Sequence, residues 1–143
     1  MVITCSRKIG FSAGHRVLGH EGLCAYPHGH NYVVIVVATA DQLDSVGRVI
    51  DFSVLKERLG QWVEQHWDHN FIVFEQDHEM LTALKLISGS REPYIASFNP
   101  TAENMAHYLL TTICPAVFLD TGVKVVRVIV EETSNCSATA EEF

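Results

Sequence analysis

The sequence has little that would tie it to a membrane, an oxidising compartment or nucleic acid. None of its apolar runs reaches the ~18 residues that a membrane-spanning helix needs. The N-terminus lacks a charged stretch followed by an apolar one, so we expect no signal peptide and no membrane association. The four cysteines form no Cys-x-x-Cys pair, which predicts reduced thiols in the cytoplasm. The net charge of −7 disfavours nucleic acid as a partner, because a phosphate backbone is bound by a basic face.

What the chain does have is enough apolar material for one core. It contains 143 residues, of which 48% are hydrophobic, and we found no internal repeat, low-complexity tract or linker. These features predict a single folded domain over residues 1–143.

Alternation and helical periodicity divide the chain into elements. We expect strands at 2–13, 28–40 and 123–132, and helices at 54–66, 78–87 and from 102 to 113. A loop fills 14–27, a turn and a short extended piece fill 41–52, a turn fills 88–93, and 94–98 is extended. The order predicts an α+β fold, an antiparallel sheet with two main helices on one face. Such a sheet leaves open edges, which favours an oligomer or closure into a barrel.

Cap residues mark where the two main helices begin. Asp51 or Ser53 suits the start of the first helix, and Asn99 or Thr101 suits the start of the second. Pro115 is expected to end the second helix, because proline lacks the N–H that a helix interior uses.

Three histidines have the spacing of a metal site. His28 and His30 are two residues apart at the start of a strand, so they share a face, and His15 ends an upstream alternating segment. A hairpin between the segments would gather three imidazoles, the ligand set of a catalytic zinc ion with an open fourth position. Cys24 lies in the intervening loop. A thiol beside a dication is biased toward thiolate and could act as base or nucleophile, although a free cysteine is also a common buried apolar residue.

Three further polar residues, Asp68, His69 and Glu132, each allow two interpretations. Asp68 and His69 are either a polar helix end or a carboxylate-oriented imidazole that relays a proton. Glu132 continues an apolar strand face. It either reaches solvent or anchors the N–H groups of a planar heterocycle. Thr101 and Glu103 suit a helix cap and a first-turn acid.

Taken together, these motifs resemble the 6-pyruvoyltetrahydropterin synthase / 6-carboxytetrahydropterin synthase family over about residues 9–138. The motifs are Phe-x-Ala-x-His at 11–15, Cys-x-x-x-His-Gly-His at 24–30, Asp-His at 68–69, Pro-Thr-x-Glu at 100–103 and Glu-Thr at 132–133. The cysteine followed by His-Gly-His, with the upstream histidine, is the specific part of the resemblance.

The resemblance implies a tunnelling fold, in which three subunits close a β-barrel and two trimers stack as a hexamer. It implies active sites shared between subunits. It places the zinc ligands on His15, His28 and His30 and the catalytic thiol on Cys24. The same resemblance implies a proton relay at Asp68 and His69, and pterin binding by Glu132, Thr101 and Glu103.

The implied substrate is 7,8-dihydroneopterin triphosphate. Only three residues separate Cys24 from His28, which resembles the bacterial carboxy-forming branch that supplies queuosine and other deazapurines. That branch releases triphosphate and acetaldehyde. The alternatives are the pyruvoyl-forming reaction, without carbon–carbon cleavage, and a non-catalytic pterin- or zinc-binding relative. The chain departs from the family in its longer segment 72–98, and Arg16, Lys56 and Arg127 are the candidate cations for the triphosphate.

Overall fold

The computed structural model describes residues 1–89 and 91–143 as a six-stranded sheet with helices on one face. The strands are β1 (Thr4–His15), β2 (His28–Ala40), β3 (Asn70–Phe74), β4 (Tyr94–Ala96), β5 (Val123–Thr133) and β6 (Cys136–Glu141). The helices are α1 (Phe52–His66), α2 (His78–Lys85), α3 (Ala102–Tyr108) and α4 (Cys114–Val117). A 3-10 turn, η1 (Leu23–Ala25), lies between β1 and β2, and a π-helical segment, η2 (Leu109–Ile113), joins α3 to α4.

The sheet order is β4-β3-β1-β2-β5-β6, and its centre is antiparallel as expected. Two strands depart from the expectation. β3 pairs with β1, and β4 pairs with β3, in parallel. Short β3 follows a helix, and α2 connects it to β4, so the chain returns in the same direction each time. The sequence prediction missed β3 and β6, and it placed an extended piece before α1 where the structure has no strand.

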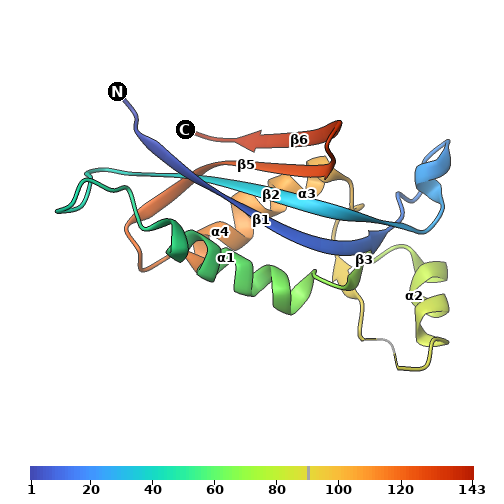
Figure 1. Cartoon of the computed structure of the whole chain (residues 1–143). Helices are drawn as coiled ribbons and strands as arrows, with labels where there is room; N and C mark the ends of the chain where they lie inside the picture. Colours follow the sequence, from blue (N-terminus) through green and yellow to red (C-terminus); the bar gives the residue numbers. More distant parts are fainter. Residues whose placement is uncertain (90) are drawn as a thin grey trace.

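The core lies between the sheet and helices α1, α3 and α4, which run along one face in Figure 1. Along β2, the buried Tyr32, Val34 and Val36 alternate with Val33 and Ile35, which are only half-buried. One face of the central strand is therefore covered by helices, and the other is less covered within a single chain.

The helix boundaries follow the predicted caps. Asp51 accepts a hydrogen bond from the Ser53 amide and caps α1, and Thr101 accepts one from the Asn104 amide and caps α3. α2 forms where the short helix was expected. Ser90, in the turn expected at 88–93, lies outside the described residues.

The prediction that Pro115 ends the last helix is wrong. The chain continues as α4 to Val117, with Pro115 in its first turn. The preceding π-helical segment ends at Ile113, and a new α-helical segment, α4, begins at Cys114. Pro115 therefore lies in a first helical turn, where its missing N–H needs no partner.

Candidate metal centre and catalytic pocket

The ends of β1 and β2 bring the three predicted histidines together. His15 and His28 are register partners in the antiparallel ladder, as are Ala13 and His30. His28 and His30 lie on one face of β2, since side chains alternate along a strand. One ligand atom from each of His15, His28, His30 and Glu132 lies within 4.8 Å of the others. This group of four could hold a metal ion.

Hydrogen bonds to backbone carbonyls fix two of these rings. Nδ1 of His15 donates to the Pro100 carbonyl at 2.6 Å, and Nδ1 of His28 donates to the Tyr26 carbonyl at 2.7 Å. A carbonyl oxygen only accepts, so each ring carries its proton on Nδ1 and presents the Nε2 lone pair. This second hydrogen bond is the arrangement that orients histidine ligands at metal sites.

Burial favours the neutral form of two of these imidazoles. It lowers the pKa of His15, which is 1% exposed, to about 4, outweighing the Pro100 hydrogen bond that raises it. Burial also lowers the pKa of His30, against the charge of Glu132. Neutral imidazole is the form that binds a metal ion.

Glu132 lies at the cluster itself. Its Oε2 is 2.9 Å from Nε2 of His30 and 3.9 Å from Nε2 of His15. The 2.9 Å contact does not have hydrogen-bond geometry, so the buried Nε2 of His30 has no hydrogen-bond partner among the described residues. An orphaned buried nitrogen facing a carboxylate fits a cation between them. The donor set of three imidazoles and one carboxylate fits zinc.

The Asp68–His69 pair forms at the turn after α1. Nδ1 of His69 lies 3.0 Å from Oδ1 of Asp68, an ion-pair distance. The same carboxylate oxygen accepts the Ser12 amide at 3.0 Å, and the His69 amide donates to the Ser12 carbonyl at 2.6 Å. Adjacent side chains converge here because His69 has a positive φ of 55°. The two side chains have the geometry of an oriented imidazole.

The charge of Asp68 is held by this turn. Partial burial raises its pKa, but the hydrogen bonds from the Ser12 amide and His69 more than offset that effect and leave the pKa lowered. The side chain of His69 is 79% exposed. An ionised carboxylate behind an exposed imidazole is suited to proton transfer near neutral pH.

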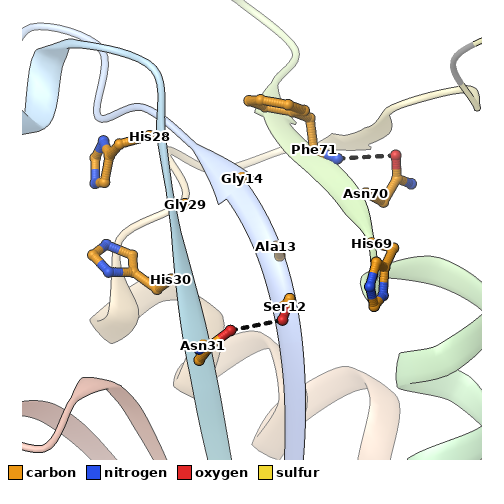
Figure 2. A pocket seen from close by; sticks show the side chains of 10 residues that line it. All are labelled: Ser12, Ala13, Gly14, His28, Gly29, His30, Asn31, His69, Asn70 and Phe71. Atoms are coloured by element: carbon orange, nitrogen blue, oxygen red, sulfur yellow. Dashed lines mark hydrogen bonds between the residues drawn. The ribbon is translucent and has the colours of Figure 1, made fainter.

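A pocket of about 470 Å³ lies beside these groups. It is lined by Ser12, Ala13, Gly14, His28, Gly29, His30, Asn31, His69, Asn70 and Phe71. In Figure 2, strands β1 and β2 lie between the imidazoles of His28 and His30 on one side and His69 on the other. Among residues 1–89 and 91–143, no hydrogen bond or ion pair joins His69 to the histidine cluster.

The remaining predicted residues lie at different distances from the cluster. Cys24 is in η1, partly buried, and its carbonyl accepts the Val17 amide at 2.8 Å. Thr101 caps α3 next to Pro100, so it is close to His15, while Glu103 is exposed in the first turn of α3. Within one chain, no hydrogen bond or ion pair between described residues links Cys24 with Asp68 or His69.

Sequence reasoning missed the residues that hold these groups in place. Arg91 donates to the carbonyls of Asp68 and Gln65, both at 2.7 Å, and so braces the turn that carries the pair. Tyr32 is 1% exposed, and its ring lies 5.4 Å from that of His30. Its alternation with His28 and His30 was the available signal, whereas nothing in the sequence pointed to Arg91.

The chain matches known proteins over almost its whole length. The family model described as 6-pyruvoyl tetrahydropterin synthase matches residues 4–142. A Rickettsia typhi protein named 6-carboxy-5,6,7,8-tetrahydropterin synthase is 38% identical over 135 residues, covering 94% of this chain and 97% of that protein. A Halobacterium salinarum protein with the probable form of that name is 34% identical, covering 92% and 82%.

Solved structures agree on the fold. A protein of Wolinella succinogenes superposes with a TM-score of 0.83 at 22% identity, covering 100% of this chain and 99% of that one. A 6-pyruvoyltetrahydropterin synthase of Plasmodium vivax superposes with a TM-score of 0.73 at 22% identity, covering 99% and 98%. None of the helices that the structure describes is long and apolar enough to cross a bilayer. The full-length family match and the near-complete coverage of the Rickettsia protein show that this chain belongs to the 6-pyruvoyl tetrahydropterin synthase family.

Proposed function

We propose that this protein is a zinc-dependent lyase that converts 7,8-dihydroneopterin triphosphate to 6-carboxy-5,6,7,8-tetrahydropterin. The reaction consumes one water and releases triphosphate and acetaldehyde. The observation that carries the proposal is the convergence of three imidazoles and Glu132 within 4.8 Å, beside an open pocket. The relatives named 6-carboxytetrahydropterin synthase, at 34–38% identity, support this branch of the family.

Different residues of the chain bind the metal and transfer protons. His15, His28 and His30 hold the metal, and their Nδ1 hydrogen bonds keep the first two rings in the ligating tautomer. When bound, zinc supplies Lewis acidity that makes protons next to the substrate's side-chain oxygens easier to remove. Cys24 takes one of these protons, and the Asp68–His69 pair moves another.

Glu132, Thr101 and Glu103 bind the pterin. A carboxylate matches two parallel N–H donors of a planar ring, and Glu132 is half-buried at the rim of the cluster. Its 2.9 Å contact with Nε2 of His30 supports a role for Glu132 beside the metal ligands.

The complete site requires more than one chain. In Figure 2, β1 and β2 lie between His69 and the imidazoles of His28 and His30, although all three histidines line the same pocket. Among the described residues, no hydrogen bond or ion pair links Cys24 with Asp68 or His69. The half-covered face of β2 fits a neighbouring subunit. We therefore propose a homo-oligomer, a trimer or hexamer, in which Asp68 and His69 of one subunit complete the site of another. The free cysteines support a cytoplasmic location for it.

A product assay tests the function. Zinc-loaded protein is incubated with 7,8-dihydroneopterin triphosphate, and acetaldehyde, triphosphate and the pterin products are quantified. We expect equal amounts of acetaldehyde, triphosphate and carboxytetrahydropterin. Pyruvoyltetrahydropterin without acetaldehyde would replace this proposal with the pyruvoyl-forming reaction, and the absence of turnover would favour a pterin- or zinc-binding role.

A further inference from the structure

An ion pair fastens the chain immediately after the first metal ligand. Nε of Arg16 donates to Oδ2 of Asp77 at 2.6 Å, and Nη2 donates to Oδ1 at 2.5 Å. Nη1 also reaches Glu79 at 3.2 Å, but that carboxylate is exposed and adds little. Asp77 is 3% exposed and the side chain of Arg16 is 16% exposed. A two-point pair at this depth fixes both position and orientation.

Asp77 also begins α2. Its Oδ1 accepts the Met80 amide at 3.1 Å, so the carboxylate that grips Arg16 is the N-cap of that helix. Beyond the cap, Met80 and Leu84 pack with Val73 in a small apolar cluster of their own. α2 is thus packed in its own apolar cluster and presents Asp77 to the residue that follows β1. It belongs to the segment 72–98, which the family resemblance leaves without a role.

The pair acts where strand pairing stops. β1 and β3 pair through Ala13–Asn70 and Gly14–Phe71 and no further. Arg16 and Asp77 lie just beyond the ends of these two strands and continue the connection through their side chains. This contact therefore constrains the direction in which the chain leaves His15.

The segment that follows leads directly to the thiol. The Val17 amide donates to the Cys24 carbonyl at 2.8 Å. Leu18 exchanges two hydrogen bonds with the side chain of Asn99, at 3.0 and 2.9 Å. A shift of Arg16 would be transmitted through its neighbour Val17 to Cys24.

We propose that Arg16, held by Asp77 at the start of α2, is a positioning residue that sets the placement of the Cys24 loop relative to the metal ligand His15. The inference rests on the proposed function, in which Cys24 takes a substrate proton. Arg16 is then unsuited to bind the triphosphate, because releasing it would leave the buried Asp77 carboxylate unpaired.

The first test is Asp77→Asn in the zinc-loaded protein. Asparagine is a good N-cap, so α2 keeps its cap while the charge that holds Arg16 is removed. The matched control is Asp120→Asn, which breaks the exposed pair between Asp120 and Arg58 after α4. The readouts are kcat, KM, zinc content, the rate of Cys24 alkylation by iodoacetamide, and hydrogen exchange of residues 16–24.

We expect Asp77→Asn to lower kcat about tenfold, since small displacements of a reacting group are costly, with KM changed less than about twofold. Cys24 alkylation and exchange of residues 16–24 should both accelerate at least about threefold, because the loop loses one of its anchors. Zinc content should stay at the wild-type value. Asp120→Asn should match the wild type in all five readouts.

Arg16→Lys separates positioning from substrate binding. Lysine keeps the charge but loses the two-point geometry, so we expect the same loss in kcat and the same faster alkylation. A rise in KM for Arg16→Lys, with an unchanged or lower KM for Asp77→Asn, would instead make Arg16 a triphosphate ligand. Unchanged alkylation and exchange in Asp77→Asn would overturn the inference. These two measurements need no substrate, so they decide it even if the proposed reaction is not observed.

Discussion

The Nε2 atoms of His15 and His28 lie 3.1 Å apart. Both rings donate from Nδ1 to a backbone carbonyl, so two lone pairs face each other across the gap. Burial lowers the pKa of His15 to about 4, so this ring is neutral at neutral pH and presents a lone pair. A cation resolves this repulsion, and the arrangement is therefore prepared for a metal ion.

Loss of one imidazole should abolish the metal site. We expect His28→Ala to weaken zinc binding by more than about 100-fold, because removing a ligand costs more than removing a group that merely orients one. Competition with a chromophoric chelator and metal analysis of the purified protein measure this. His107→Ala, at the exposed end of α3, is the control and should retain zinc. Stoichiometric zinc in His28→Ala would show that the site is assigned to the wrong residues.

Glu132 can be tested as pterin anchor against metal ligand. We expect Glu132→Gln to keep its zinc while KM for the pterin rises about 10- to 100-fold, because a charge-assisted pair of hydrogen bonds is weakened. Zinc content and steady-state kinetics are measured on the same preparation. If the variant loses its zinc, Glu132 is the fourth ligand and the anchor must be sought elsewhere.

Neutralising the carboxylate behind His69 should slow proton transfer. Asp68→Asn can still accept the Ser12 amide, so the turn is retained while the imidazole loses its charged partner. We expect kcat to fall by about 10²-fold or more with zinc content unchanged. Asp44→Asn, which changes an exposed carboxylate paired with Arg48, should keep full activity. Full activity in Asp68→Asn would remove the relay from the mechanism.

The Asp77 carboxylate should make the free energy of unfolding depend on pH in the acid range. The hydrogen bonds from Arg16 lower its pKa below the ordinary 3.8 despite burial. Its stabilising effect is therefore present above pH 3.8 and lost as the pH falls through the lower folded-state pKa. We expect Asp77→Asn to reduce the free energy of unfolding by about 3 kcal/mol at pH 7, with the difference from wild type shrinking below pH 3.8. Urea unfolding of both proteins at pH 7, 4 and 3 measures it. A difference independent of pH would mean that the carboxylate charge contributes nothing.

Local patterns predicted much of the fold. The alternation along 28–40 and 123–132 predicted the two central strands, because a half-buried strand repeats every two residues. β3 and β6 escaped notice for physical reasons. β3 is only five residues long, and β6 alternates exposed with partly exposed residues, so neither carries a strong periodic signal.

Pro115 shows where a local rule failed. In isolation, proline predicts a helix end. Here the buried Leu110, Ile113 and Cys114 keep the chain against the core, and a π-helical segment absorbs the irregularity. Tertiary packing outweighed the local preference.

The sequence by itself determined which side chains are available and which share a strand face: His28 with His30, and Glu132 with the apolar face of β5. Those relations follow from the period of a strand, which needs no tertiary information. Only the tertiary structure decided that His15 and His28 are register partners and that Glu132 contacts His30. It also decided that Asp77 forms an ion pair with Arg16. These contacts join residues from 13 to 102 positions apart, and only the packing of separate elements brings such residues together.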